Sequence, residues 1–296
     1  MISFLLIIFS SLFFTGIVVR VKSKAQGRRG PAVLQPIYDV IRLLRKGSVY
    51  SATCGPIFRI APTIYLASVV MAIAVVPFGG RAGIVSFSCD FVFFAYVLAF
   101  GKFFNIIAAL DTGSSFEGMG ASREALFSML AEPAFFLLIG SLGLISGNTS
   151  FSDIFASFHL GSYASYAFAV VAAFVLLMIC MVENSRMPVD DPKTHLELTM
   201  IHEVMILDNS GFDLGLIMQA THLKFAMYSA LIANLFICEL PLWAAIVAFF
   251  AIEALCAVAV GLTESFMARY RMSHNAQFIL ALTSLSLLIF FGVKII

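Results

Sequence analysis

The sequence has few charged residues and almost no tryptophan. Charged side chains make up 12% of its 296 residues, 61% of the residues are hydrophobic, and only 1 is tryptophan. Soluble domains carry about 25% charged residues, so this chain could not cover its surface with polar groups, and a soluble enzyme is excluded. The formal net charge of +1 lacks the basic excess of nucleic-acid-binding proteins. The composition indicates an integral membrane protein with no nucleic-acid partner.

Cysteine is also scarce, and its spacing argues against a metal centre built by this chain. No two cysteines form a Cys-x-x-Cys pair, and none has a histidine at ligand spacing, so we expect neither an iron–sulfur nor a zinc site. Cysteines beside apolar runs usually pack as small hydrophobic side chains. We expect this chain to bind no cofactor or metal, and any redox centre to lie in another subunit. The 5 cysteines are Cys54, Cys89, Cys180, Cys238 and Cys256.

No repeat, low-complexity tract or proline- or serine-rich linker divides the chain, so we predict one transmembrane domain over 1–296. A bilayer core of about 30 Å needs around 20 apolar residues in a helix. The first apolar run is predicted to stay as a helix, because its basic residues follow it and no small-residue cleavage site appears. The predicted fold is an all-α bundle of transmembrane helices with an amphipathic helix and an acidic helical loop. Eight spans are predicted: 2–21, 61–79, 86–110, 126–145, 162–182, 215–237, 240–262 and 276–295.

Basic residues are distributed unequally between the two sides of these spans. The first, third, fifth and seventh loops carry nearly all of them, and the intervening loops offer only Arg81. Cytoplasmic loops carry the excess of lysine and arginine. We therefore expect both termini to face outward and the main loops to face the cytoplasm, as in a multi-pass protein of the cytoplasmic (inner) membrane.

The first of these loops contains a short amphipathic segment, residues 34–46. Pro36 suits the first turn of a helix and Gly47 suits its exit. Apolar residues form a stripe on one side, and acidic and basic residues lie mostly on the other, which is typical of a helix in the membrane interface. It acts either as a basic anchor or as one wall of a pocket or docking face.

The second loop, residues 111–124, is rich in glycine. No Lys-Ser/Thr pair follows its glycines, so a phosphate-binding loop is not indicated. We expect Gly118 and Gly120 to permit tight turns where the loop meets a partner or another loop, and Ser122 to cap the fourth span. The loop and docking residues expected here and after the fifth span are Asp111, Arg123, Glu124 and Arg186.

The third loop, residues 182–211, is acidic. Asp191 can cap, and Pro192 can open, a helix running to about Asn209. On such a helix His195 and His202 share a face but lie about 10.5 Å apart along the axis, too far for easy joint ligation of a metal. A hydrogen-bonded, protonatable surface is the favoured interpretation, with Glu197 and Glu203 beside these histidines.

Ionisable residues also fall inside or at the ends of the apolar spans. A charge at a helix centre costs about 2.5–3.5 kcal/mol on insertion scales, and such groups usually face a bundle interior and often relay protons. Lys224 and Glu239 are expected to snorkel from span ends, whereas Lys102 and Glu253 lie within spans. Pro133 frees a backbone carbonyl beside Glu132. The candidate proton path comprises Glu132, Glu183, Asp190, Asp191, Glu197 and Glu203, with His195 and His202.

Three segments carry a family resemblance. They are LQPIYDVIRLLRK (34–46), ALDTGSSFEGMGASREALFSMLAEPA (109–134) and VENSRMPVDDPKTHLELTMIHEVM (182–205). They resemble the core membrane subunit 1 family of proton-pumping respiratory complex I, and most closely its branch in group 4 membrane-bound [NiFe] hydrogenases and formate hydrogenlyase (subunit 4). The chain departs from the branch after Met205, with Asp-Asn-Ser-Gly-Phe (208–212) where the family often has Glu-Tyr-Ser-Gly-Arg.

The resemblance implies a non-catalytic subunit that links electron transfer in a peripheral arm to proton or sodium translocation. It implies hydrogenase large and small subunits, iron–sulfur subunits and antiporter-like membrane subunits as partners, which hold the [NiFe] centre and the iron–sulfur clusters. A quinone-pocket subunit of a complex I-type NADH:quinone oxidoreductase is the alternative. A membrane enzyme holding Mg²⁺ and a diphosphate at Asp190–Asp191 lacks a second Asp-rich motif, and a stand-alone transporter would show two repeated halves with broken helices.

Overall fold

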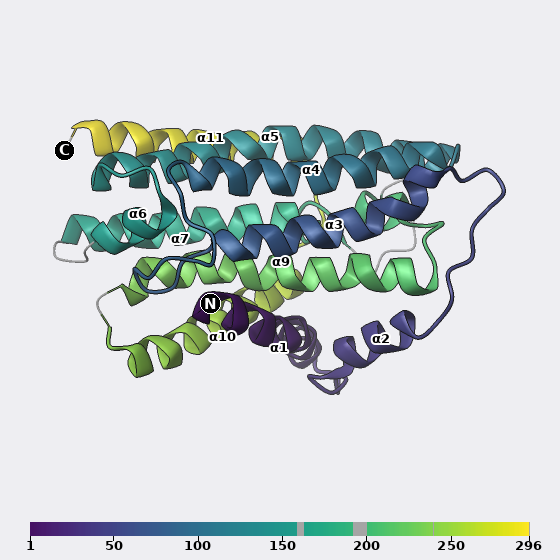
Figure 1. The fold of residues 1–296 in the computed structure, drawn as a ribbon, viewed down its shortest axis with the longest axis horizontal. Helices are drawn as coiled ribbons and strands as arrows, with labels where there is room; N and C mark the ends of the chain where they lie inside the picture. The colour runs from purple at the N-terminus through teal and green to yellow at the C-terminus, as the bar shows by residue number, and fades with distance from the viewer. Residues whose placement is uncertain (159–162, 192–199, 239, 296) are drawn as a thin grey trace.

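The computed structural model describes residues 1–158, 163–191, 200–238 and 240–295. Within those residues the chain forms long helices that lie side by side in one bundle, with shorter helices at its ends (Figure 1). The short helices are α2 (Gln35–Leu44), α6 (Phe151–Ser157) and α8 (His202–Met205). The long helices are α1 (Ile2–Ala25), α3 (Pro56–Val75), α4 (Asp90–Asp111), α5 (Ser115–Ser146), α7 (Tyr163–Glu183), α9 (Gly211–Ile237), α10 (Leu242–Phe266) and α11 (Met272–Ile295).

The long helices are the predicted membrane spans. In the described residues 8 helices are long and apolar enough to cross a bilayer, so the predicted number of spans is confirmed, and the chain is a multi-pass membrane protein. The chain alternates in direction through the bundle. We call the end at which α4, α7 and α10 finish and α5, α9 and α11 begin the α2 end, because α2 lies there (Figure 1).

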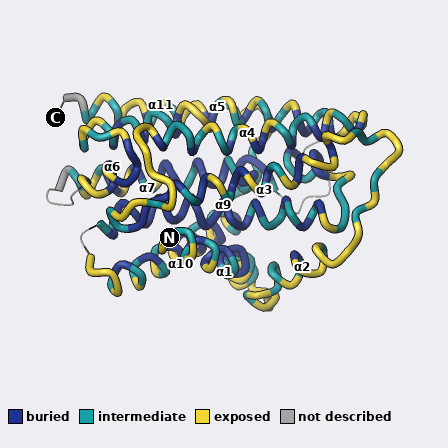
Figure 2. Tube along the Cα trace, in the orientation of Figure 1, coloured by how far each residue is buried: buried dark blue, intermediate teal, exposed yellow. Residues whose placement is uncertain are grey.

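Helix α9 forms the centre of the bundle. Of its apolar window 89% is buried, against 17–44% for the other spans, although its mean hydropathy of 1.2 is the lowest among them. Buried residues concentrate in the middle of the bundle, where α9 runs (Figure 2). Protein therefore surrounds α9 in place of lipid, and it can carry polar residues that a lipid-facing helix could not.

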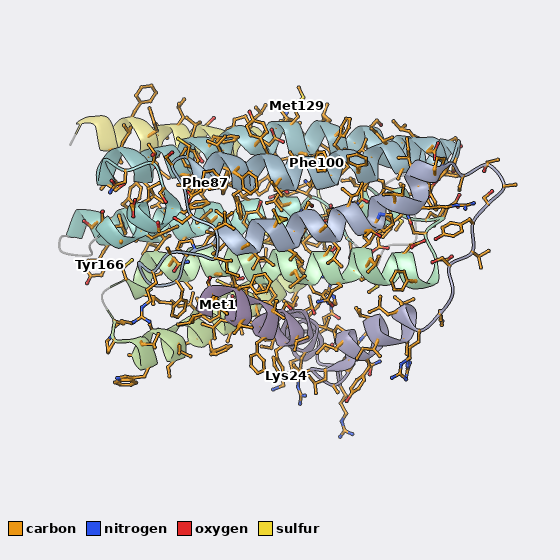
Figure 3. The ribbon with its side chains drawn as sticks, in the orientation of Figure 1. Met1, Lys24, Phe87, Phe100, Met129 and Tyr166 are labelled. Atoms are coloured by element: carbon orange, nitrogen blue, oxygen red, sulfur yellow. The ribbon has the colours of Figure 1, made fainter. Side chains whose placement is uncertain are left out.

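The outer helices present apolar side chains outward. Met129 on α5 and Phe100 on α4 are exposed, and Met129 lies at the upper edge of the view in Figure 3. Exposed apolar surface on this scale would destabilise a soluble monomer, whereas acyl chains or neighbouring membrane helices cover it in a bilayer.

Helix α2 confirms the predicted amphipathic helix. Its first turn contains Pro36, and only Val40 of its residues is fully buried. It packs on the first turns of α9, where Gly215 lies so close that an added Cβ would be 3.1 Å from Leu44. The charged side of α2 faces away from the bundle, as an interfacial helix requires.

The structure corrects the predicted glycine-rich loop. Only residues 112–114 connect α4 to α5, and α5 begins at Ser115, so Gly118 and Gly120 lie inside a helix and make no turn. The hydroxyl of Ser122 donates to the carbonyl of Met119 within that helix and caps nothing. Hydropathy detects only the apolar part of α5, whereas the polar part extends beyond it as a helix because α8 packs against it.

Gly120 brings α5 and α8 together, and this contact carries the first prediction. A Cβ on Gly120 would lie 2.5 Å from Val204 Cγ1 and 2.9 Å from the carbonyl oxygen of Ile201. Gly120→Ala should therefore destabilise the protein by about 1–3 kcal/mol through overpacking, measured as a lower midpoint of thermal unfolding in detergent.

Gly118 provides the matched control two residues away. Its added Cβ would meet only Leu110 Cδ2, at 3.9 Å. Gly118→Ala should raise stability by up to about 1 kcal/mol, because alanine is the better helix former. Equal midpoints for the two variants would contradict the close contact between α5 and α8.

The predicted helix over 192–209 is also wrong in the part that the structure describes. Met200 and Ile201 are not helical, and α8 spans only His202–Met205. The reason is the carboxylate of Asp190, whose Oδ2 accepts the N–H groups of Ile201 and His202 at 3.1 and 3.2 Å. A helix continuing through Ile201 would give those N–H groups to carbonyls of the preceding turn, so this capping begins a new helix there. Residues 192–199 lie outside the described part of the chain.

Candidate functional site

A buried network of charges crosses the bundle near the α2 end. Lys102 Nζ on α4 lies 3.3 Å from Glu124 Oε1 on α5 and 3.0 Å from Glu183 Oε2 at the end of α7. Lys224 Nζ on α9 lies 3.2 Å from the same Glu183 oxygen. We call these four residues, Glu124, Lys102, Glu183 and Lys224, the buried network. Four helices thus contribute one charge each.

One side of α5 is polar and faces Lys102. Glu124, Ser128 and Glu132 follow each other at intervals of four residues, which places them on one side of a helix. Lys102 Nζ donates a hydrogen bond of 2.6 Å to Ser128 Oγ, between the two acids. The face combines a docking residue and a proton-path residue of the sequence prediction, and the structure brings both near the same lysine.

The network is neutral and nearly dry. Its two lysines and two glutamates balance, and the side chain of Lys224 is 1% exposed. Moving one such charge out of water costs several kcal/mol unless a partner compensates. Lys224 also donates to the backbone carbonyl of Glu183 at 2.9 Å. The expectation that Lys224 snorkels to the interface is therefore wrong: a buried acid holds it inside. Glu239 lies outside the described residues.

Glu132 lies at the edge of this network. It is exposed on the surface of α5 and lines an outward-facing groove of about 540 Å³ between α4 and α5, together with Lys102 and Ser128. A second cavity of about 30 Å³ joins Glu132, Lys102 and Glu183. Within the described chain no ion pair is formed by Glu132 itself. The structure therefore places this acid where the network opens toward the outside of the bundle.

Glu264, a buried acid outside the buried network, links the ends of α1 and α10 to the segment after α7. Glu264 lies 3.3 Å from Lys22 Nζ and 3.1 Å from Arg186 Nη1. The guanidinium of Arg186 also lies over the ring of Phe225, 5.0 Å from its centroid. Arg186, predicted as a docking residue, is thus fixed by the bundle itself.

Asp190 fixes the rest of that segment. Its carboxylate lies 2.9 Å from Arg269 Nη2 and accepts the N–H of Asp191 at 2.9 Å, besides those of Ile201 and His202. Burial raises the pKa of Asp190 above its ordinary value, and Arg269 and the N–H donors oppose that rise. The described parts of this segment, residues 186–191 and 200–205, are therefore tied to α5, α10 and the α10–α11 connection.

His202 is partly buried beside the buried network. Burial lowers its pKa, and the positive charges of Lys224, Lys102 and Arg186 lower it further, against the opposing effect of Glu124. The folded protein therefore favours the neutral imidazole. An unfolded chain, in which histidine titrates near pH 6.5, takes up the proton first as pH falls.

This difference predicts a loss of stability in mild acid. Because the pKa of His202 is lower in the folded state, stability should fall as pH drops through about 6.5. His202→Gln should reduce the drop in thermal midpoint between about pH 7.5 and about pH 5.5. The exposed His274 supplies the control, since His274→Gln should leave the drop unchanged. An equal drop in the wild type and His202→Gln would contradict the prediction.

Other predicted residues are distributed around these contacts. Asp111 Oδ2 accepts the N–H of Gly55 at 2.8 Å, and Arg123 Nη1 donates to the carbonyl of Met200 at 3.0 Å. Asp111 at the end of α4 and Arg123 on α5 therefore each hold a connecting segment of this chain to a helix. Glu203 is half-buried and lines a cavity of about 80 Å³ with Asn184, Arg186, His202 and His222. His195 and Glu197 lie outside the described residues.

Sequence reasoning misses the pairing partners. It identifies Lys102 and Lys224 as intramembrane charges but does not place them in the proton path, and it does not single out Glu264. The interval of four between Glu124, Ser128 and Glu132 is a signal that could have found part of the network. Among the described residues no group of three or more histidine, cysteine, aspartate or glutamate side chains is arranged to hold a metal ion.

Known proteins are similar to this sequence over most of its length. A family model described as NADH dehydrogenase matches residues 1–293. Hydrogenase-4 component C of Escherichia coli K12 is 30% identical over 231 residues, covering 76% of this chain and 70% of that one. Formate hydrogenlyase subunit 4 of the same organism is 28% identical over 226 residues, covering 75% and 72%.

Two further similarities come from respiratory complexes. A subunit of the NADH-quinone oxidoreductase of Ralstonia pickettii is 27% identical over 221 residues, covering 71% of this chain and 62% of that one. A chain in the structure of the membrane-bound sulfane sulfur reductase, an archaeal respiratory membrane complex, superposes with a TM-score of 0.81 at 16% identity over 98% of both chains. This last similarity shows that the fold is shared.

Proposed function

The chain belongs to the NADH dehydrogenase family, and from that premise we propose that it is the membrane anchor and ion-coupling subunit of an energy-converting [NiFe] hydrogenase or formate-hydrogenlyase-like complex. Two relatives, a hydrogenase-4 component at 30% identity and a formate hydrogenlyase subunit at 28%, support this. The [NiFe] centre and iron–sulfur clusters would belong to the hydrogenase and iron–sulfur subunits, and antiporter-like subunits would lie beside this one in the inner membrane.

The quinone-reducing alternative has weaker support. The NADH-quinone oxidoreductase relative is less similar, at 27% identity, and the chain spans only 62% of its length. The segment 182–205, which includes Val-Asp-Asp-Pro (189–192), also resembles the hydrogenase branch more closely than the quinone-reducing one.

The buried network is the observation that carries the proposal. A neutral set of charges in low dielectric responds strongly to small movements of any member. The segment after α7 contacts this set directly, because Ser185 Oγ donates to Glu124 Oε2 at 3.3 Å, and His202 lies beside it. Electron transfer in a peripheral partner docked on the α2 end would shift this segment and thereby drive proton or sodium movement. In this proposal the α2 end faces the cytoplasm, consistent with its excess of basic residues.

Glu132 supplies the test of this mechanism. In the complex reconstituted into liposomes, Glu132→Gln should lower the number of ions moved per hydrogen produced several-fold, because the network loses the acid at its outward opening. Asp191→Ala should also lower that ratio. Dye-linked hydrogenase activity in detergent, which depends on the partner subunits, should stay largely intact.

Asp153→Asn is the matched control. Asp153 is an exposed acid on α6, at the opposite end of the bundle, and its neutralisation should leave the ratio unchanged. Unchanged ratios in both Glu132→Gln and Asp191→Ala would refute the proposed mechanism.

A further inference from the structure

Glu253 is a buried acid that the buried network does not include. It lies in the middle of α10, it is 4% exposed, and both of its carboxyl oxygens lack a hydrogen-bond partner in the described structure. No lysine or arginine of the described chain pairs with it. It lies eleven residues before Glu264, about 16 Å along the helix, and is therefore far from the ion pairs at the α2 end.

The described groups around Glu253 can accept a hydrogen bond from it, and none of them carries a positive charge. The hydroxyls of Ser10 on α1 and Ser229 on α9 face it. Each hydroxyl already donates its own proton to a carbonyl of its helix: Ser10 to Ile7 at 3.1 Å and Ser229 to Phe225 at 2.7 Å. A hydroxyl used in this way can only accept from a neighbour, so the site suits a carboxylic acid that donates and not a carboxylate that accepts.

Two thiols also interact with this site. Cys256, one turn further along α10, and Cys180 on α7 both interact electrostatically with Glu253. Both thiols are buried, and neither supplies a positive charge. An isolated carboxylate here would carry the full desolvation cost of a buried ion, which proteins avoid by neutralising the group.

Cys180 interacts with both this site and the buried network. Cys180 precedes Glu183 by one turn of α7, and Cys180 also interacts with Lys224. Tyr228 on α9, next to Ser229, interacts with both Glu183 and Cys180. Tyr228 also lines the small cavity that contains Lys102 and Glu183.

We propose that Glu253 is a second proton-binding site, where the side chain holds a proton as a neutral carboxylic acid at the α1–α9–α10 interface and exchanges it with the buried network during turnover. The inference that Glu253 holds a proton rests only on the burial of its side chain and on the residues around it. The exchange rests on the proposed function.

Infrared spectroscopy of the resting complex tests the occupancy. The spectrum of the wild type minus that of Glu253→Gln should contain the C=O band of a protonated carboxylic acid. The corresponding difference for Glu264→Gln should lack it, because Glu264 is a carboxylate held by Lys22 and Arg186. Absence of the band from the Glu253 difference overturns the proposal.

Chemical labelling of the unmutated complex makes this result independent of any folding defect. Dicyclohexylcarbodiimide, an apolar reagent, adds to protonated carboxylic acids with retention of all atoms and is located by mass spectrometry of peptides. Glu253 should be labelled several-fold more than Glu264. Equal or weaker labelling of Glu253 counts against the proposal.

Deuterium exchange tests the second step. In D₂O the Glu253 band should shift slowly at rest and several-fold faster during turnover. A band that shifts at the same rate in both conditions overturns the exchange step. Because the band itself is measured at rest, its presence does not depend on whether this chain couples ion movement, which the Glu132 experiment decides separately.

Discussion

Replacing Glu183 with glutamine is expected to destabilise the protein by roughly 3–5 kcal/mol and to stop ion translocation. Glu183 Oε2 lies within 3.2 Å of both Lys102 and Lys224, so a neutral side chain leaves two buried lysines with one remaining acid. The uncompensated cost of burial is largest for Lys224, since its side chain is 1% exposed and its other partner is a backbone carbonyl. Thermal unfolding in detergent measures the first effect, and ion movement per hydrogen produced in liposomes measures the second.

A combined variant separates stability from function. Lys102→Met, Glu124→Gln, Glu183→Leu and Lys224→Met together replace the buried network with side chains of similar size that carry no charge. Apolar replacements of whole buried ion networks are often neutral or stabilising, so this variant should recover most of the stability lost in Glu183→Gln. It should still move no ions. A combined variant that pumps normally would show that these charges only hold the helices together.

Much of the fold could be predicted because the bilayer dictates it. Each span is an apolar run of the length that the membrane requires, and the amphipathic α2 has clear start and stop signals. The errors occur where a helix continues past its apolar part. The first turns of α5 are polar, yet they stay helical because Glu117 Oε1 accepts the N–H of Asp208 and Gly120 packs on α8.

The site was harder to predict, because pairing depends on distant parts of the chain. Lys102 and Lys224 are 122 residues apart in sequence and meet the same carboxylate only after α4, α7 and α9 have packed together. Hydropathy marks α9 only as the least apolar of the spans, and its central position explains why Lys224 and Tyr228 are tolerated inside it. Similarly, the side chain of Asp190 accepts the first N–H groups of α8 from eleven and twelve residues away, a contact that no local capping signal in the sequence indicates.

Asp190 carries the second large effect. Asp190→Ala should destabilise the protein by about 3–5 kcal/mol, because it breaks the ion pair with Arg269 and frees the N–H groups of Asp191, Ile201 and His202. Hydrogen–deuterium exchange followed by mass spectrometry should show faster exchange over residues 200–206. Asp190→Asn should cost less, because its one amide oxygen can still accept the N–H groups of Ile201 and His202, although the charge and the bond to the N–H of Asp191 are lost.

Arg269→Met separates the two roles of Asp190, its ion pair with Arg269 and its hydrogen bonds to backbone N–H groups. This variant removes the ion pair but leaves the carboxylate on the three N–H groups, so exchange over residues 200–206 should change little even though stability falls. Slow exchange in Asp190→Ala would contradict the capping role. The proposed function requires the segment after α7 to transmit movement from a docked partner to the buried network. Asp190→Ala should therefore lower the ion-to-hydrogen ratio more than Arg269→Met does. Only Asp190→Ala releases α8 from the position at which His202 lies beside Glu124 and Lys224.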